Sequence, residues 1–356
     1  MPRTIAFFGS SLVSAYWNGA ATYYRGIIRA LAARGHRVTF FEPDAYDRQK
    51  HRDMDDPPWA RVVVYAATPD GVAGALEAAR GADVVVKASG VGVFDNLLAE
   101  AIPDLRRQSG LAVYWDVDAP ATLDQLRREP NAVLARQIPR YDLILTYGGG
   151  LPVVEGYRTL GARSCTPVYN ALDPETHHPV LAEDRFAADL TFLGNRLPDR
   201  EARVENFFLQ AAALGPQRRF LLGGAGWDDK PRPGNVRYLG HVGTRDHNAL
   251  NVSALAILNI TRDSMAANGW SPPTRVFEAA GAGGCLITDA WAGIEGFLEP
   301  DREVLVARDA ADVTAHLARL TPARARAIGV AARRRTLAQH TYAHRAAQVE
   351  ALLEGS

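Results

Sequence analysis

Short apolar runs alternate with longer amphipathic segments along almost the whole chain. This alternation is typical of β-α units whose strands assemble into a parallel sheet. In the first half we expect strands at 4–8, 38–41, 61–65, 83–86, 111–115 and 142–145. A helix from about Asn18 to Arg34 follows the first of them, with Asn18 as its N-cap and Gly35 as its stop.

The rhythm breaks at residues 169–179, where turn formers and two prolines predict a linker. It then restarts, with strands expected at 190–193, 220–222, 236–239, 255–260, 286–288 and 304–306. Helices are expected at 201–214, 274–282, 311–320, 322–339 and 342–353. Because 356 residues exceed what one hydrophobic core supports, we expect two Rossmann-like, doubly wound α/β domains that face a cleft. They would span 1–172 and 173–340, with the final segment, about 341–356, able to pack back on the first domain.

The charges of the chain exclude one class of partner. Lys plus Arg and Asp plus Glu number 40 each, so the net charge is zero and no global basic field exists to hold nucleic acid. The apolar runs are too short for a membrane span or a secretion signal, which predicts a cytoplasmic protein. Two distant cysteines, Cys165 and Cys285, form neither a metal motif nor a disulfide framework.

The glycine-rich stretches argue against two common ligands of α/β proteins. A dinucleotide site needs G-x-G-x-x-G after a strand, but the first loop supplies only Gly9 before Asn18-Gly19. The stretch 223–226 comes closer, yet Asp229 stands where the last glycine should be. The Walker-type pattern G-x-x-x-x-G-K-[ST] is absent and no glycine-rich stretch contains a lysine, so a P-loop nucleotidase is disfavoured as well.

The stretch 268–289 contains the most informative motif. Ser271 is a candidate N-cap, and two prolines after it fit a helix start, so backbone N–H groups would form a phosphate cradle. Thr274 and Arg275 add a hydroxyl and a guanidinium, and Glu278, one turn later, could accept hydrogen bonds from a ribose diol. The alternative for Arg275 and Glu278 is an ordinary ion pair on a helix surface.

At this point the chain resembles the CgeB-like (spore-maturation) glycosyltransferases of the two-domain GT-B architecture. The strongest part of the resemblance is Arg275-Val276-Phe277-Glu278-Ala279 with its continuation through 283–289, 293–297 and 302–305. Similar blocks occur, in matching order, at 114–120, 141–146, 171–174, 178–179 and 190–195 with Arg200.

The resemblance implies roles for the second domain. Glu278 would bind the ribose, and Trp270 stands where related retaining enzymes have another Glu. The remaining donor-binding candidates are Gly9, Ser10, Asn195, Arg196, Arg200, His241, Val242, Ser271, Thr274 and Arg275. Among these, the loop with His241 and Val242 would meet the base, and Asn195, Arg196 and Arg200 would meet the diphosphate.

The first domain would bind the acceptor. Asp116 and Asp118 follow a buried strand, and one of them could deprotonate the acceptor or hold a sugar hydroxyl. The alternative is that they only cap the following turn. Trp17, Tyr23 and Tyr24 could stack on a sugar, and the alternative is that they pack in the core with the first helix.

The expected function is therefore a metal-independent glycosyltransferase of the hexosyltransferase type. It would move a sugar from a nucleoside-diphosphate sugar to an unknown hydroxyl or other nucleophilic acceptor, with no cofactor besides the donor. The alternatives are a GT-B-type nucleotide-sugar epimerase or hydrolase, and a catalytically silent nucleotide-sugar-binding protein.

Overall fold

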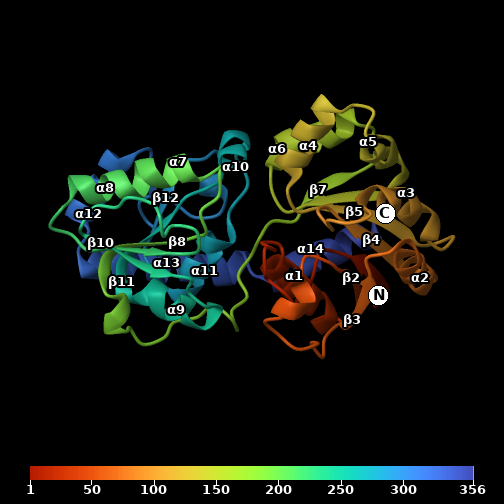
Figure 1. Cartoon of the computed structure of the whole chain (residues 1–356), viewed down its shortest axis with the longest axis horizontal. Coiled ribbons are helices and arrows are strands. Elements are labelled where there is room, and N and C mark those ends of the chain that lie inside the picture. Colours follow the sequence, from red (N-terminus) through yellow and green to blue (C-terminus); the bar gives the residue numbers. More distant parts are fainter. Residues whose placement is uncertain (356) are drawn as a thin grey trace. The chain divides into compact units, whose positions relative to one another are not determined.

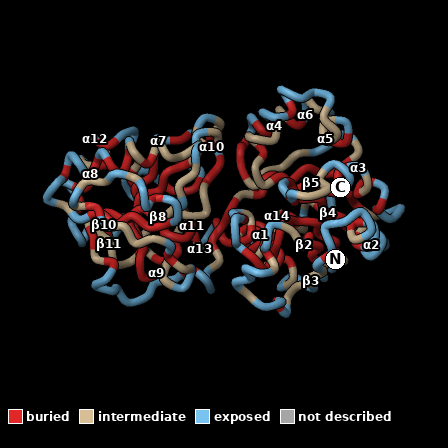
Figure 2. The backbone as a smooth tube through the Cα atoms, in the orientation of Figure 1, coloured by how far each residue is buried: buried red, intermediate tan, exposed pale blue. Residues whose placement is uncertain are grey.

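The computed structural model describes residues 1–355 and divides the chain into two compact units. Unit 1 comprises residues 1–170 together with the segment from Tyr342 onward. Unit 2 is the continuous stretch Ala171–Thr341. Figure 2 shows that in each unit the buried residues concentrate on the strands and the exposed ones on the surrounding helices and loops.

The sheet of unit 1 has seven parallel strands in the order β3-β2-β1-β4-β5-β6-β7. Their bounds are β1 (Thr4–Phe8), β2 (Arg37–Asp44), β3 (Arg61–Ala66), β4 (Val84–Ala88), β5 (Leu111–Asp116), β6 (Leu143–Thr146) and β7 (Cys165–Pro167). β4, β5 and β6 are buried along their whole length, which explains their near-continuous apolar sequences.

The helices of unit 1 cover both faces of this sheet. They are α1 (Ala21–Ala33), α2 (Pro69–Ala79), α3 (Asp95–Leu105), α4 (Ala119–Arg128), α5 (Val133–Gln137), α6 (Gly150–Thr159) and α14 (Tyr342–Glu354), with the 3₁₀ turns η1 (Arg48–His51) and η2 (Ile138–Arg140). α14 returns from the end of the chain and packs against α1 (Figure 1). The contact is close: a Cβ on Gly26 would lie 2.2 Å from the Tyr342 ring.

Two local expectations for unit 1 were wrong. Asn18 does not cap α1, because its side-chain amide donates to the carbonyls of Ser11 and Ser14, and the helix begins only at Ala21. β7 was not expected, since three half-buried residues carry too short an apolar signal. The chain passes from β2 to β3 with only the turn η1 between them.

The sheet of unit 2 has six parallel strands in the order β10-β9-β8-β11-β12-β13. They are β8 (Ala188–Leu193), β9 (Phe220–Gly223), β10 (Val236–Gly240), β11 (Ala254–Asn259), β12 (Leu286–Asp289) and β13 (Leu305–Ala307). The helices are α7 (Glu201–Val204), α8 (Gln210–Leu214), α9 (Thr244–Ser253), α10 (Asp263–Asn268), α11 (Thr274–Ala282), α12 (Ala310–Arg319) and α13 (Pro322–Gln339). The 3₁₀ turns are η3 (Asp184–Phe186) and η5 (Ile294–Gly296), and a π-helical turn, η4 (Glu205–Leu209), joins α7 to α8.

Figure 1 shows α7, α8 and α12 on one face of the second sheet and α9 and α11 on the other. In both units the first strand lies inside the sheet, and the strand order reverses beside it, between β1 and β4 and between β8 and β11. This reversal confirms the predicted pair of doubly wound sheets. In such sheets, ligands bind beyond the carboxyl ends of the strands at the reversal point.

Candidate functional site

The best-defined site of unit 2 is built around helix α11. It begins at Thr274 after Pro273, and no side chain caps its amino end. Ser271 is not the N-cap that the sequence suggested, because its hydroxyl donates to the Gly269 carbonyl at 3.1 Å. The first turn of α11 therefore presents its N–H groups without a side-chain acceptor, as an anion-binding helix end does.

Glu278 lies one turn into α11 and is only 8% exposed. Its Oε2 is 3.1 Å from Arg275 Nη1, and its Oε1 is 3.8 Å from His177 Nε2. Burial alone would raise the pKa of the Glu278 carboxyl, but Arg275, His177 and His247, together with a hydrogen bond from Thr274, hold it below its ordinary value. Glu278 is thus a buried, charged hydrogen-bond acceptor.

Two histidines back this carboxylate. His177, from the segment that opens unit 2, and His247, on α9, stack with ring centroids 6.3 Å apart. Nδ1 of each ring is buried without a hydrogen-bond partner. Burial, assisted by the positive charge of Arg275, lowers the pKa of His247 to about 4. Sequence analysis missed this pair because only the three-dimensional fold brings residues 70 positions apart to one carboxylate.

Arg200 and Arg275 form the cationic part of the site. Nε of both guanidiniums and Nη1 of Arg275 are buried without a hydrogen-bond partner. Burial lowers the pKa of Arg200 to about 10, and the positive charge of Arg275 acts in the same direction. Buried N–H groups without acceptors are rare in folded proteins. Besides the ion pair between Arg275 and Glu278, these two guanidiniums therefore keep N–H groups that a further anion could accept from.

The other two residues expected at the diphosphate are differently engaged. Arg196 bonds Glu201 at 2.7 Å and Asp229 at 2.8 Å, and these carboxylates raise its pKa. Asn195 is exposed, and its side-chain oxygen accepts from the Ala225 N–H at 2.9 Å. Arg196 is therefore paired with two carboxylates, whereas Arg275 is paired with Glu278 alone and Arg200 donates to the Asn195 carbonyl.

The two candidates for contact with the base, in the loop after β10, differ in exposure. His241 is exposed, whereas Val242 is buried in a cluster with Leu221 and Leu250. Gly240, which ends β10, has a φ of +67°, a conformation that favours glycine. Only the backbone of this turn and the His241 side chain are accessible to a ligand.

Trp270 occupies a strained position just before α11. Its φ is +51°, its N–H donates to the Ala292 carbonyl at 2.7 Å, and it is 36% exposed. A Cβ on Gly293 would lie 2.4 Å from the indole, so the ring rests directly on that glycine. An indole cannot accept hydrogen bonds from sugar hydroxyls as a carboxylate would.

In unit 1 the two candidate acid-base residues, Asp116 and Asp118, differ in burial. Asp116, at the end of β5, is fully buried; one oxygen accepts from the Tyr157 hydroxyl and the other from the Asp118 N–H. Asp118 precedes α4 and is half-buried. The geometry makes Asp116 a support for the backbone of Asp118, and Asp118 remains the better candidate for contact with a ligand.

Gly9 and Ser10 are packed into the turn after β1. A Cβ on Gly9 would lie 2.5 Å from the Phe40 ring, so glycine is required there. The buried Ser10 hydroxyl donates to the side-chain oxygen of Asn18 at 2.9 Å. Both residues shape the turn. Gly9 has no side chain to offer a ligand, and the side chain of Ser10 is buried.

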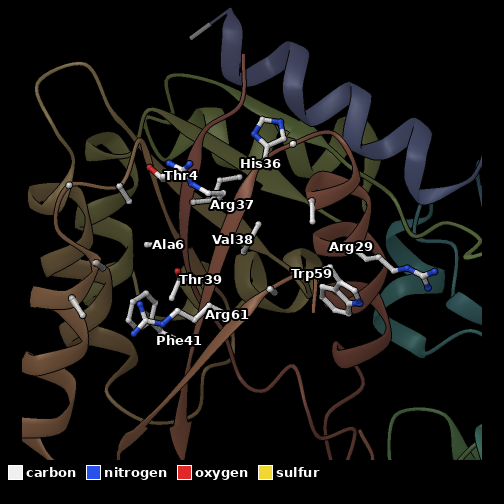
Figure 3. A pocket seen from close by; sticks show the side chains of 18 of the residues that line it. Thr4, Ala6, Arg29, His36, Arg37, Val38, Thr39, Phe41, Trp59 and Arg61 are labelled. Carbon is white, nitrogen blue, oxygen red and sulfur yellow. The ribbon is translucent and has the colours of Figure 1, made fainter. Parts of the chain in front are cut away.

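A separate cavity of about 950 Å³ lies near the amino ends of the strands of the first sheet, away from the turn that follows β1 (Figure 3). Its lining includes Thr4, Arg37 and Arg61, the first residues of β1, β2 and β3, together with Trp59. Because it sits at the amino ends of parallel strands, it is not at the edge where doubly wound sheets bind their ligands.

Within residues 1–355, no group of three or more His, Cys, Asp or Glu side chains is arranged to hold a metal ion. None of the helices in that range combines the length and apolar character needed to cross a bilayer.

Solved structures share this architecture over the whole chain. Sucrose-phosphate synthase from Thermosynechococcus elongatus matches with a TM-score of 0.73 and 16% identity, covering 99% of this chain and 98% of that chain. HepE from Anabaena, solved with UDP and glucose, matches with a TM-score of 0.71 and 14% identity, covering 99% of this chain and 100% of that chain. The chain has the GT-B glycosyltransferase fold.

Two further comparisons bear on this GT-B chain. An α-glucosyltransferase solved with UDP and DNA matches with a TM-score of 0.71 and 12% identity over 100% of both chains. A family model described as glycosyl transferase-like matches residues 200–351, which include Arg200, Arg275 and Glu278. No curated protein sequence matches this chain.

Proposed function

We propose that this chain is a metal-independent glycosyltransferase, of the hexosyltransferase type and nearest to the CgeB-like group within the GT-B fold. The observation that carries the proposal is that Arg200 and Arg275 both keep buried guanidinium N–H groups without a hydrogen-bond partner, beside the buried carboxylate of Glu278. A nucleoside diphosphate supplies what these groups lack: phosphate oxygens for the guanidiniums and a ribose diol for the carboxylate.

The reaction would break the bond between the sugar C1 and the β-phosphate oxygen, which keeps the electron pair. The amino end of α11 and the two arginines would stabilise the negative charge that develops there. The acceptor oxygen bonds to C1 and its proton passes to a base, for which Asp118 is the candidate in unit 1. Arginines and helix N–H groups can replace a divalent cation in this role, so the proposed reaction would need no metal ion or cofactor besides its donor and acceptor.

The solved relatives suggest which donor to test first. HepE is described with UDP-glucose, and the α-glucosyltransferase with UDP and UDP-glucose. We therefore propose UDP-glucose as the first donor, with GDP- and dTDP-sugars as comparisons.

The decisive experiment measures UDP, GDP and dTDP binding to the full chain by calorimetry, with and without EDTA. At least one diphosphate should bind in the presence of EDTA, and Glu278→Ala should weaken it by about 10- to 100-fold, the effect of one or two lost hydrogen bonds to a charged group. Glu295→Gln, an exposed carboxylate two elements away, is the matched control. If no nucleotide binds, the proposal fails.

A second candidate, nucleotide-sugar binding without transfer, is favoured by the full burial of Asp116 and by the indole of Trp270. Donor turnover separates the candidates. Release of UDP only with an acceptor indicates transfer, and release without one indicates a hydrolase or epimerase. Tight binding with no turnover would support the silent protein.

A further inference from the structure

The loop between β1 and α1 exposes two aromatic rings. Trp17 is 74% exposed and Tyr16 is 41% exposed, although an exposed indole forgoes a large gain from burial. Their centroids lie 6.4 Å apart in an edge-to-face arrangement. Tyr16 also stacks on His51 of η1, with centroids 4.0 Å apart. We call Tyr16, Trp17 and His51 the aromatic platform.

The platform belongs to a tightly fastened loop. Asp53 pairs with Arg25 at 2.6 Å and accepts from the Ala15 N–H at 3.2 Å. The Arg25 Nε donates to the Leu12 carbonyl at 2.7 Å, and the Ser14 hydroxyl donates to the His51 carbonyl at 2.8 Å. These bonds tie residues 12–15 to residues 51–53 on both sides of the platform.

A buried carboxylate secures the same loop from below. Glu42, at 0% exposure in β2, accepts from the Ser11 hydroxyl at 2.9 Å and from the Leu12 N–H at 2.6 Å. Gln49 of η1 donates to it at 2.6 Å. The backbone that leads into the platform is therefore held in place before any ligand arrives, which lowers the entropy lost on binding.

The backbone at Trp17 is strained, with a φ of 46°. For a bulky residue this left-handed conformation costs free energy and persists only where the surroundings impose it. Such strain occurs most often at ligand sites. The loop also follows β1, where the strand order of the first sheet reverses, so Trp17 lies at the ligand-binding edge.

We propose that Trp17 and Tyr16 stack on a ring of an uncharged saccharide, which is the acceptor of the proposed transfer. That this saccharide is the acceptor rests on the proposed function; that a saccharide binds at the platform does not. The apolar face of a sugar ring stacks on an aromatic ring, while its hydroxyls need polar neighbours, which the Arg25–Asp53 pair provides in the same loop region.

The chemistry of the surroundings disfavours other ligands. Leu12 and Val13, the large aliphatic residues of the loop, are fully buried, so the exposed apolar surface is mainly aromatic and Ala15 adds only a methyl group for a lipid tail. Arg25 is neutralised by Asp53, so the platform has no excess positive charge to attract an anionic membrane or a phosphorylated acceptor.

The test measures saccharide binding directly, so it does not depend on turnover. Calorimetry of the full chain follows titration with methyl glycosides and with β- and α-linked disaccharides, in the presence and absence of UDP, and the tryptophan emission of the wild type and of Trp59→Ala is recorded alongside. The variants are Trp17→Phe, Trp17→Ala and Trp59→Ala. Trp59 is the matched control, because it is a half-buried tryptophan of unit 1 at the opposite ends of the strands (Figure 3).

At least one saccharide should change the emission of the wild type and of Trp59→Ala. Trp17→Ala should lower the affinity for that saccharide by about tenfold or more, and Trp17→Phe should lie between Trp17→Ala and the wild type. The affinity for UDP should stay within about twofold. Where transfer is measurable, the loss should appear in the acceptor KM more than in kcat.

Three outcomes would overturn the inference: equal saccharide affinity in Trp17→Ala and wild type, binding of benzyl alcohol or anionic vesicles but of no saccharide, or no response to any probe. If UDP binds and no saccharide does, the platform assignment fails and the proposed function stands. If saccharides bind through Trp17 and no nucleotide binds, the proposed function fails instead.

Discussion

His177 Nε2 lies 3.8 Å from Oε1 of Glu278, the carboxylate proposed to hold the ribose. His177 belongs to the segment that opens unit 2, and the neighbouring Thr176 carbonyl accepts from Asn248 of α9 at 2.9 Å. The chain therefore brings a titratable ring against the proposed donor site as soon as it enters unit 2.

His177→Asn should shift the acid limit of nucleotide binding. Removing this ring removes one of the influences that keep the pKa of Glu278 below its ordinary value. Since the ribose hydroxyls need the charged carboxylate, diphosphate affinity should then fall at a higher pH than in the wild type. Calorimetry across a pH series checks this, with the exposed neighbour His178→Asn as control. Coincident profiles for wild type and His177→Asn would contradict the role given to His177.

Arg275→Ala should weaken the binding of UDP much more than the binding of uridine. The guanidinium is proposed to meet the diphosphate, and a hydrogen bond to a charged group contributes about 1.5 to 3 kcal/mol. The expected loss for UDP is about 10- to 100-fold, while uridine changes little. Arg196→Ala, whose charge is already paired with Glu201 and Asp229, should lose less. Equal losses for both variants would show that pairing does not distinguish them.

His247 should make the protein less stable in acid. Its pKa falls from 6.5 to about 4 on folding, chiefly through burial, so below about pH 6.5 the unfolded chain binds more protons. Stability is therefore complete above that pH and falls towards pH 4, by up to about 3 kcal/mol. Denaturant unfolding at a series of pH values should show a flatter dependence in His247→Gln. His178→Gln should keep the wild-type slope.

Gly26→Ala should destabilise unit 1, because the added Cβ would lie 2.2 Å from the ring of Tyr342. Overpacking of this kind costs about 1 to 3 kcal/mol. Adding Tyr342→Ala should recover part of the loss, and thermal unfolding of the single and double variants measures the coupling. Gly74→Ala in α2 meets no atom within 4 Å and should stabilise instead. Independent, additive effects at Gly26 and Tyr342 would rule out the contact.

Local sequence predicted the elements that depend on local signals. The helices 201–214, 274–282 and 322–339 have the expected bounds, counting the π-helical turn in the first, because a proline or glycine marks an end of each: Gly215, Pro273 with Gly283, and Pro322. Asn18 and Ser271 were read as caps and are not, because each side chain found a nearby carbonyl instead.

The site was predictable only in part. Arg275 and Glu278 share one helix face, so sequence spacing could bring them together. The family resemblance added Arg200 to them, whereas His177 and His247 join them only through tertiary packing, which spacing does not encode. The difference between Arg196 and Arg200 is likewise invisible in the sequence, since it depends on Asp229, 33 positions from Arg196.

The return of α14 to unit 1 sets an order for biosynthesis. Unit 2 is a continuous stretch and holds all its strands once Thr341 has left the ribosome. Unit 1 is translated first, but the surface of α1 at Gly26, which Tyr342 covers, stays exposed until α14 has been synthesised. A growing chain therefore completes its second unit no later than its first, and a premature stop after Thr341 leaves a nascent first half with an apolar seam uncovered.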